Sequence, residues 1–163
     1  MYKKEENFKE KFRQALISTA KVISDDYKSL KNKKKKIDTD SFELFELENL
    51  NNINDFTKFR AESDSAALKK KFSNKEVYQK NIPNSSSRRS LYEVSEKIRY
   101  EFLGSQMLKG ISKNLKENYN NKLAQKNNNT LRSKEDVPVT DAFELYMLKK
   151  FFDIKLNLYS EKV

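Results

Sequence analysis

Apolar residues recur at helical spacing along much of this chain. In residues 5–27 they stand mostly three or four positions apart, in a stripe of Phe8, Phe12, Ala15, Leu16, Thr19, Ile23 and Tyr27. This spacing places them along one stripe of a helix. We therefore expect an amphipathic helix near the start of the chain.

The same period predicts further helices downstream. A second helix is predicted for residues 51–72 from the helical spacing of Ile53, Phe56, Phe59, Ser63, Ala66 and Ala67. A further turn is expected at Val77 and Tyr78 before Pro83 ends it. A third helix, residues 88–103, rests on Leu91, Val94, Ile98 and Phe102, and the next carries Ile111, Leu115 and Tyr119. A last helix opens at Pro138 and Asp141, with Asp141 and Glu144 at the spacing of a capping box. Its apolar stripe consists of Phe143, Tyr146, Met147, Phe151, Ile154 and Leu158.

Gly104 and Gly110 are the only two glycines of the sequence. Gly104 stands just past an apolar helix, where a residue with positive φ commonly ends the helix. We expect Gly104 to be that C-terminal cap.

Three tracts depart from the helical pattern. Residues 31–36 hold five Lys in six positions, which predicts a solvated basic loop or a polybasic contact with an acidic partner. Residues 37–50 alternate only in part and predict a short strand or hairpin. Residues 124–137 are polar and without a period, which is typical of a loop or a disordered segment.

Together these elements predict a mainly α fold. We expect a single helical domain of about five helices, with a short strand or hairpin near residues 37–50. The length of 163 residues fits one domain. Aromatic residues make up 12% of the chain, and disordered segments are poor in them, so most of the chain should fold.

Composition removes most catalytic chemistry. The sequence has no Cys and no His, which excludes disulfides, thiolate or imidazole metal ligands and the commonest general base. It has neither a glycine-rich phosphate loop nor an Asp-x-Ser-x-Ser metal-ion adhesion run. We expect no catalytic, cofactor-binding or metal-binding residue here.

Charge and hydropathy bear on partners and location. The net charge of +10 makes an acidic partner plausible, although an excess of Lys and Asn is also typical of AT-rich genomes. The sequence has no secretory signal and no run of about 18 apolar residues. We expect a cytoplasmic protein that makes no membrane contact.

Residues 60–68 form the most distinctive segment. Arg60 and Asp64 stand four apart, so they would face each other as an ion pair on a helix. The small residues around them would let another helix approach closely, either within the fold or at an interface. Farther on, we expect Arg99 and Glu101 to lie on a solvated helix edge.

These segments carry a resemblance to a known family. Residues 60–70, 98–115 and 136–145 resemble, in the same order, three stretches of the CobT family, and residues 12–16 resemble its opening stretch. The residues that mark the resemblance, which we take as a possible partner interface or structural motif, are Arg60, Asp64, Ala67, Leu68, Arg99, Glu101, Gly104 and Gly110.

The resemblance implies a subunit of the aerobic, ATP-dependent cobaltochelatase. In that family the complex inserts Co²⁺ into hydrogenobyrinic acid a,c-diamide during cobalamin biosynthesis, using ATP and Mg²⁺. The subunit assembles with the AAA+ ATPase CobS and acts on the large subunit CobN, without catalytic residues of its own.

The resemblance covers only the N-terminal region of the family. The acidic linker and von Willebrand A-type domain of CobT proteins find no match in residues 1–163. A fragment, a split subunit and a remnant without chelatase activity therefore stay open. A basic nucleic-acid-binding module is the alternative from another functional class. Base stacking needs exposed aromatic side chains, however, and the aromatic residues of this chain stand at the spacing of a buried helix face.

Overall fold

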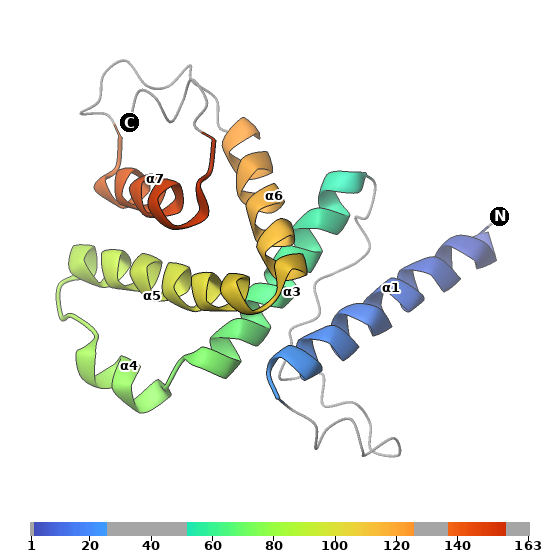
Figure 1. The fold of residues 1–163 in the computed structure, drawn as a ribbon, viewed down its shortest axis with the longest axis horizontal. Coiled ribbons are helices and arrows are strands. Elements are labelled where there is room, and N and C mark those ends of the chain that lie inside the picture. The colour runs from blue at the N-terminus through green and yellow to red at the C-terminus, as the bar shows by residue number, and fades with distance from the viewer. Residues whose placement is uncertain (1, 26–51, 126–136, 156–163) are drawn as a thin grey trace. The chain divides into compact units, whose positions relative to one another are not determined.

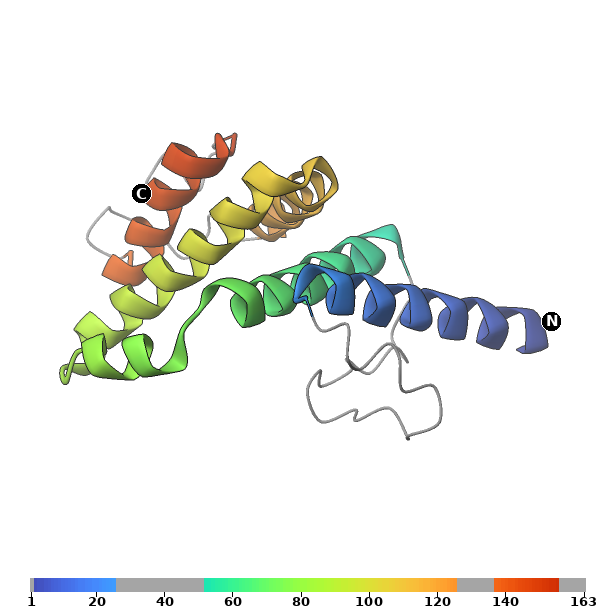
Figure 2. The ribbon, with the colours of Figure 1, turned by 60° about the horizontal axis from the view of Figure 1, so that its bottom comes forward.

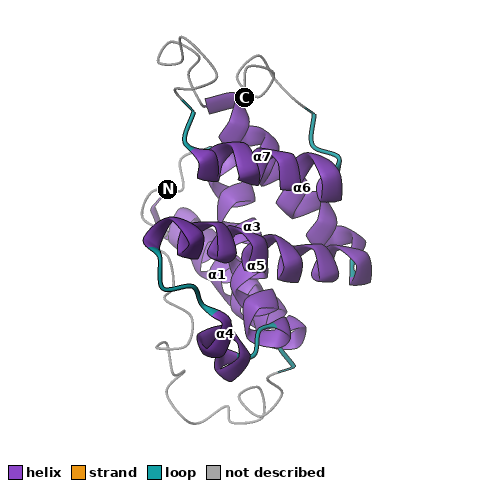
Figure 3. Ribbon diagram, turned by 90° about the vertical axis from the view of Figure 1, so that its left-hand side faces the viewer, coloured by secondary structure: helices purple, strands orange, loops and turns teal. Residues whose placement is uncertain are grey.

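The computed structural model describes residues 2–25, 52–125 and 137–155. These ranges hold six helices and no strand (Figures 1 and 3). The mainly α prediction is confirmed, but the expected number of helices was too low, because the turn predicted at Val77 is a separate helix. The basic loop at 31–36 and the strand or hairpin at 37–50 lie outside the described residues. So does most of the polar tract at 124–137.

The chain divides into two compact units, Met1–Lys71 and Phe72–Val163, and each is described by itself. The first contains α1 (Tyr2–Ile23) and nearly all of α3 (Ile53–Phe72). The ring of Phe56 meets the edges of Phe8 and Phe12, with ring centroids 5.7 and 5.0 Å apart. Aromatic contacts thus join α1 to α3. The ribbons of these two helices are drawn in Figure 2.

An ion pair joins the ends of the same two helices. Asp25 follows α1 in the left-handed conformation, with φ of 58°. Its carboxylate oxygen Oδ2 lies 2.7 Å from Lys71 Nζ in the last turn of α3. Half of the Asp25 side chain is exposed, so the pair is worth at most about 1 kcal/mol.

The buried face of α3 differs from the predicted stripe. Ile53 is 79% exposed and Ala66 is exposed too. The buried positions follow a spacing of three and four residues, but two of them are polar: Ala61, Ser63, Asp64, Ala67 and Leu68. A search for apolar periodicity misses such a face because Ser and Asp do not count toward it.

The second unit is built around α5 (Ser86–Met107), which packs against both α6 (Lys109–Gln125) and α7 (Val139–Phe152). Figures 1 and 2 both show α7 lying alongside α5. The most deeply buried apolar side chains of this unit come from all three helices: Ile98, Leu115, Leu148 and Phe152.

The short helix α4 (Lys75–Asn81) precedes α5. Asn74 caps it, because its side-chain oxygen accepts hydrogen bonds from the backbone N–H groups of Glu76 and Val77 at 2.9 and 3.1 Å. Its Tyr78 ring lies 5.3 Å from the ring of Tyr92 on α5. Capping and this contact explain why so short a segment is helical.

Two predicted helix ends were wrong. α5 continues past Gly104 to Met107, and no glycine among the described residues has positive φ. The cap is Leu108 in extended backbone, whose N–H donates to the Gly104 carbonyl at 3.0 Å. Since α6 begins at the next residue, the turn needs no left-handed glycine.

The start of the last helix also differs from the predicted cap. Pro138 is the N-cap residue of α7, so Asp141 lies inside the first turn and the predicted capping box was wrong. The helix ends at Asp153, which adopts the left-handed conformation with φ of 52°. None of the helices in the described ranges is long and apolar enough to cross a membrane.

Candidate partner-binding site

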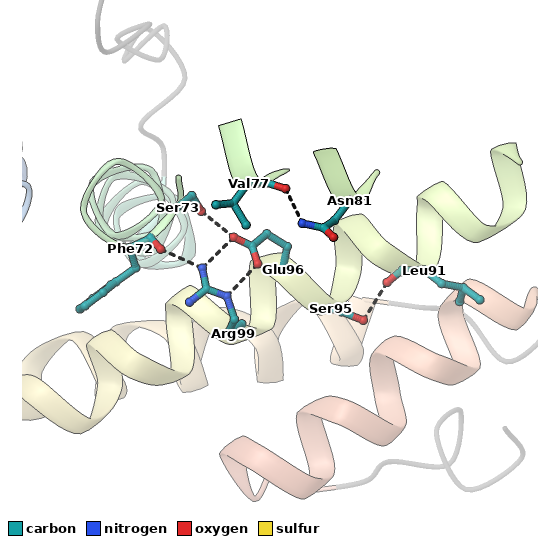
Figure 4. A network of polar contacts seen from close by, with 8 residues as sticks. All are labelled: Phe72, Ser73, Val77, Asn81, Leu91, Ser95, Glu96 and Arg99. Atoms are coloured by element: carbon teal, nitrogen blue, oxygen red, sulfur yellow. Dashed lines mark hydrogen bonds and ion pairs between the residues drawn. The ribbon is translucent and has the colours of Figure 1, made fainter. Parts of the chain in front are cut away.

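Arg99 lies at the centre of a polar network in the second unit (Figure 4). Its Nε and Nη2 donate to the two carboxylate oxygens of Glu96, both at 2.7 Å. Nη2 also donates to the Phe72 carbonyl at 2.8 Å, and the Ser73 hydroxyl donates to Glu96 at 2.8 Å. The hydrogen bond to Glu96 raises the pKa of Arg99, so this guanidinium stays charged and fixed in place.

Beside this network, α5 and α7 enclose an apolar pocket of about 210 Å³, which we call the α5/α7 pocket. The lining from α5 consists of Ser95, Ile98, Arg99, Phe102 and Leu103. Met147 and Phe151 of α7 complete the lining. The rings of Phe102 and Phe151 meet edge to face with centroids 5.1 Å apart. Phe151 is 40% exposed, so the pocket opens at the surface.

Glu101 lies elsewhere on α5 and is 1% exposed. The predicted solvated edge was therefore wrong for this residue. Its carboxylate accepts a hydrogen bond from the hydroxyl of Tyr119, which is 4% exposed on α6. Burial, followed by the charge and the hydrogen bond of Glu101, raises the pKa of Tyr119 far above its ordinary value.

Two charged groups border this buried pair. Lys97 Nζ lies 5.3 Å from the centroid of the Tyr119 ring, within reach of a cation–π contact. The same nitrogen is 3.8 Å from a carboxylate oxygen of Glu144 on α7. The contacts of Lys97, Glu101, Tyr119 and Glu144 link α5, α6 and α7, so they help to hold the three helices of this unit together.

The residues that marked the family resemblance fall into two sets. On α3, Arg60 is exposed, whereas Asp64, Ala67 and Leu68 are buried. On α5 and α6, Arg99 lines the pocket, Glu101 and Gly104 are buried, and Gly110 faces open space. The structure thus brings one of the eight, Arg99, to the pocket.

Other residues of the site were not expected to form one. Phe102, Met147 and Phe151 stood in the predicted apolar stripes and counted there as core. Tyr119 is 18 positions from Glu101, so no local pattern pairs them. Their partial exposure or pairing depends on how the helices pack, which the period of a single helix does not specify.

The acidic side chains of the described residues are the first candidates for a metal site. In residues 2–25, 52–125 and 137–155, no group of three or more His, Cys, Asp or Glu is placed to hold a metal ion. The carboxylate of Glu101 is buried against Tyr119, and that of Glu96 is bound to Arg99.

Comparison with known families decides where the chain belongs. The model described as "Cobalamin biosynthesis protein CobT" matches residues 6–157, which include nearly all of the described helices. The chain belongs to the CobT family. The resemblance noted from the Arg60 and Gly104 segments is confirmed, and it ties the chain to cobalamin biosynthesis and its multi-subunit cobaltochelatase. No solved structure matches this CobT chain.

Proposed function

We propose that this CobT chain is a non-catalytic assembly segment of the cobaltochelatase that inserts Co²⁺ into hydrogenobyrinic acid a,c-diamide. Its role is to bind the CobS-like AAA+ ATPase, and the joint assembly acts on a CobN-like subunit that holds the macrocycle. ATP, Mg²⁺ and Co²⁺ serve the complex and not this chain. The family match over residues 6–157 carries the proposal.

The geometry supports a binding role. Two pairs of polar groups in the second unit bind each other, Arg99 with Glu96 and Tyr119 with Glu101. The α5/α7 pocket, in contrast, is apolar and open. A concave apolar site with a few polar groups at its edge is the usual form of a site that binds another molecule.

The residues that mark the family have different parts in this proposal. Arg60, Arg99 and Gly110 are exposed and can contact a partner directly. The others are buried and act by holding the helices that present the surface: Asp64, Ala67, Leu68, Glu101 and Gly104.

The proposal is tested by reconstitution with the ATPase subunit from the same organism. The two purified proteins are mixed with ATP and Mg²⁺ and separated by size-exclusion chromatography. We expect stoichiometric co-elution that survives moderate salt. A duplex oligonucleotide is tested in parallel, because binding to nucleic acid falls steeply with salt through counterion release. Separate elution from the ATPase together with tight, salt-sensitive oligonucleotide binding would favour the nucleic-acid alternative.

A further inference from the structure

We propose that the α5/α7 pocket binds one apolar side chain of a protein partner whose contacting segment also carries carboxylates. This inference rests on the proposed function, since it names the surface and the chemistry through which the chain would bind its partner.

The size and lining of the pocket favour a side chain as its occupant. Its volume of about 210 Å³ is below the range of about 300–1,000 Å³ that is common for small-molecule sites. Phe102, Met147 and Phe151 give it an aromatic wall with one adaptable thioether. Aromatic residues and Met are enriched where proteins meet, and Met adapts its shape to the group it contacts.

Charge around the pocket favours an acidic segment. Lys150 is exposed on α7, directly before Phe151 and three positions after Met147, which places it on the neighbouring strip of the helix. Glu144, three positions before Met147 on the same side of α7, lies 3.8 Å from Lys97 Nζ, so its negative charge is compensated within the fold. A partner with carboxylates flanking its apolar anchor would complement this rim.

Arg99 supplies a fixed donor at the same rim. Its side chain is 45% exposed, and its bonds to Glu96 and Phe72 use Nε and Nη2. None of these bonds uses Nη1. Since the guanidinium is already held in position, a partner carboxylate that binds Nη1 loses little side-chain entropy on the Arg99 side.

The test uses the full chain and three synthetic peptides of equal length. The first is a helix-forming peptide with Leu and Phe on one face and Glu on the other. The second replaces every Glu by Lys, and the third replaces every Leu and Phe by Ala. Binding is measured by the fluorescence anisotropy of labelled peptide, which serves for every variant, and is located in the native chain by the shift of the Met147 methyl signal in NMR spectra. We expect the first peptide to bind at least about tenfold more tightly than either of the others.

Two matched variants locate the binding. Met147→Glu and Val139→Glu each add one negative charge to α7, but Val139 is 74% exposed at the helix start and does not line the pocket. We expect M147E to weaken binding of the first peptide at least about tenfold and V139E to change it less than about threefold. Phe151→Ala gives a second pocket variant in case M147E does not fold.

Several results would overturn the inference. Equal binding of the Glu and Lys peptides would refute the acidic segment, and unchanged binding to both pocket variants would refute the pocket. A Met147 shift that depends only on protein concentration would assign the pocket to a second copy of the chain. If the peptide fails while the ATPase still co-elutes, this inference falls and the proposed function stands. If the peptide binds but the ATPase does not co-elute, the pocket inference stands and the proposed function falls.

Discussion

At the residue scale, the buried pair of Glu101 and Tyr119 joins α5 to α6 inside the second unit. A buried carboxylate is costly unless hydrogen bonds replace its lost water. Tyr119 supplies one such bond from α6, and its ring also contacts Phe152 of α7 with centroids 5.9 Å apart. Tyr119 therefore donates a hydrogen bond to the buried carboxylate of Glu101 and also joins α6 to α5 and α7.

Removing the Tyr119 hydroxyl should destabilise the protein. Tyr119→Phe keeps the ring but leaves the Glu101 carboxylate without this donor. We expect the free energy of unfolding, measured by urea denaturation, to fall by about 1–3 kcal/mol. Tyr146→Phe is the control, because Tyr146 is 63% exposed and should change stability by less than about 0.5 kcal/mol. Equal effects of the two substitutions would contradict the structural role of the pair.

The pH dependence of this tyrosine has a definite sign. Because the pKa of Tyr119 is raised in the folded protein, the fold favours the protonated phenol. The stability that this preference contributes is complete below the unfolded pKa, about 10, and is lost as the pH rises above it.

Absorbance titration of the phenolate measures this directly. The chain has eight tyrosines, so the signal of Tyr119 is taken as the difference between the native chain and Y119F. We expect no ionisation in that difference until the protein unfolds at alkaline pH. A difference signal with a midpoint near pH 10, while the protein is still folded, would contradict the burial of the hydroxyl.

At the element scale, helices could be predicted from the sequence but their ends and their neighbours could not. The stripe of Leu16 and Ile23 predicted α1, and both residues are buried. Gly104 was misplaced because a cap depends on where the next helix begins, and α6 begins only two residues after α5 ends. The helical spacing of apolar residues does not distinguish a residue of the core from one that lines a pocket. For this reason Met147 and Phe151 were counted as core.

The short helix α4 gives a test at this scale. Asn74→Ala removes the side-chain oxygen that accepts from Glu76 and Val77. Loss of an N-cap costs about 0.5–2 kcal/mol, and α4 buries no residue to offset it. We expect faster amide hydrogen exchange at these two positions, measured by NMR.

A nearby asparagine supplies the control for this test. Asn84→Ala changes an exposed residue outside α4 and should leave the exchange rates of Glu76 and Val77 unaltered. Equal protection in N74A and the native chain would show that the cap contributes nothing to α4.

At the scale of the whole molecule, the two units carry different parts of the family signature. Arg60 and Asp64 lie in the first unit, and Arg99 and Gly104 lie in the second. The sequence alone supported the family because these segments keep their order along the chain. It did not reveal the α5/α7 pocket, since that pocket exists only where two helices, separated by α6 in the chain, pack side by side.

The central claim is that this chain works by joining the cobaltochelatase motor. Native mass spectrometry of the CobS-like ATPase, with ATP and with or without this chain, tests it most directly. We predict that the mass of the ATPase assembly rises by a whole-number multiple of 19.3 kDa when the chain is added. An assembly whose mass stays the same, beside free chain at 19.3 kDa, would contradict the account.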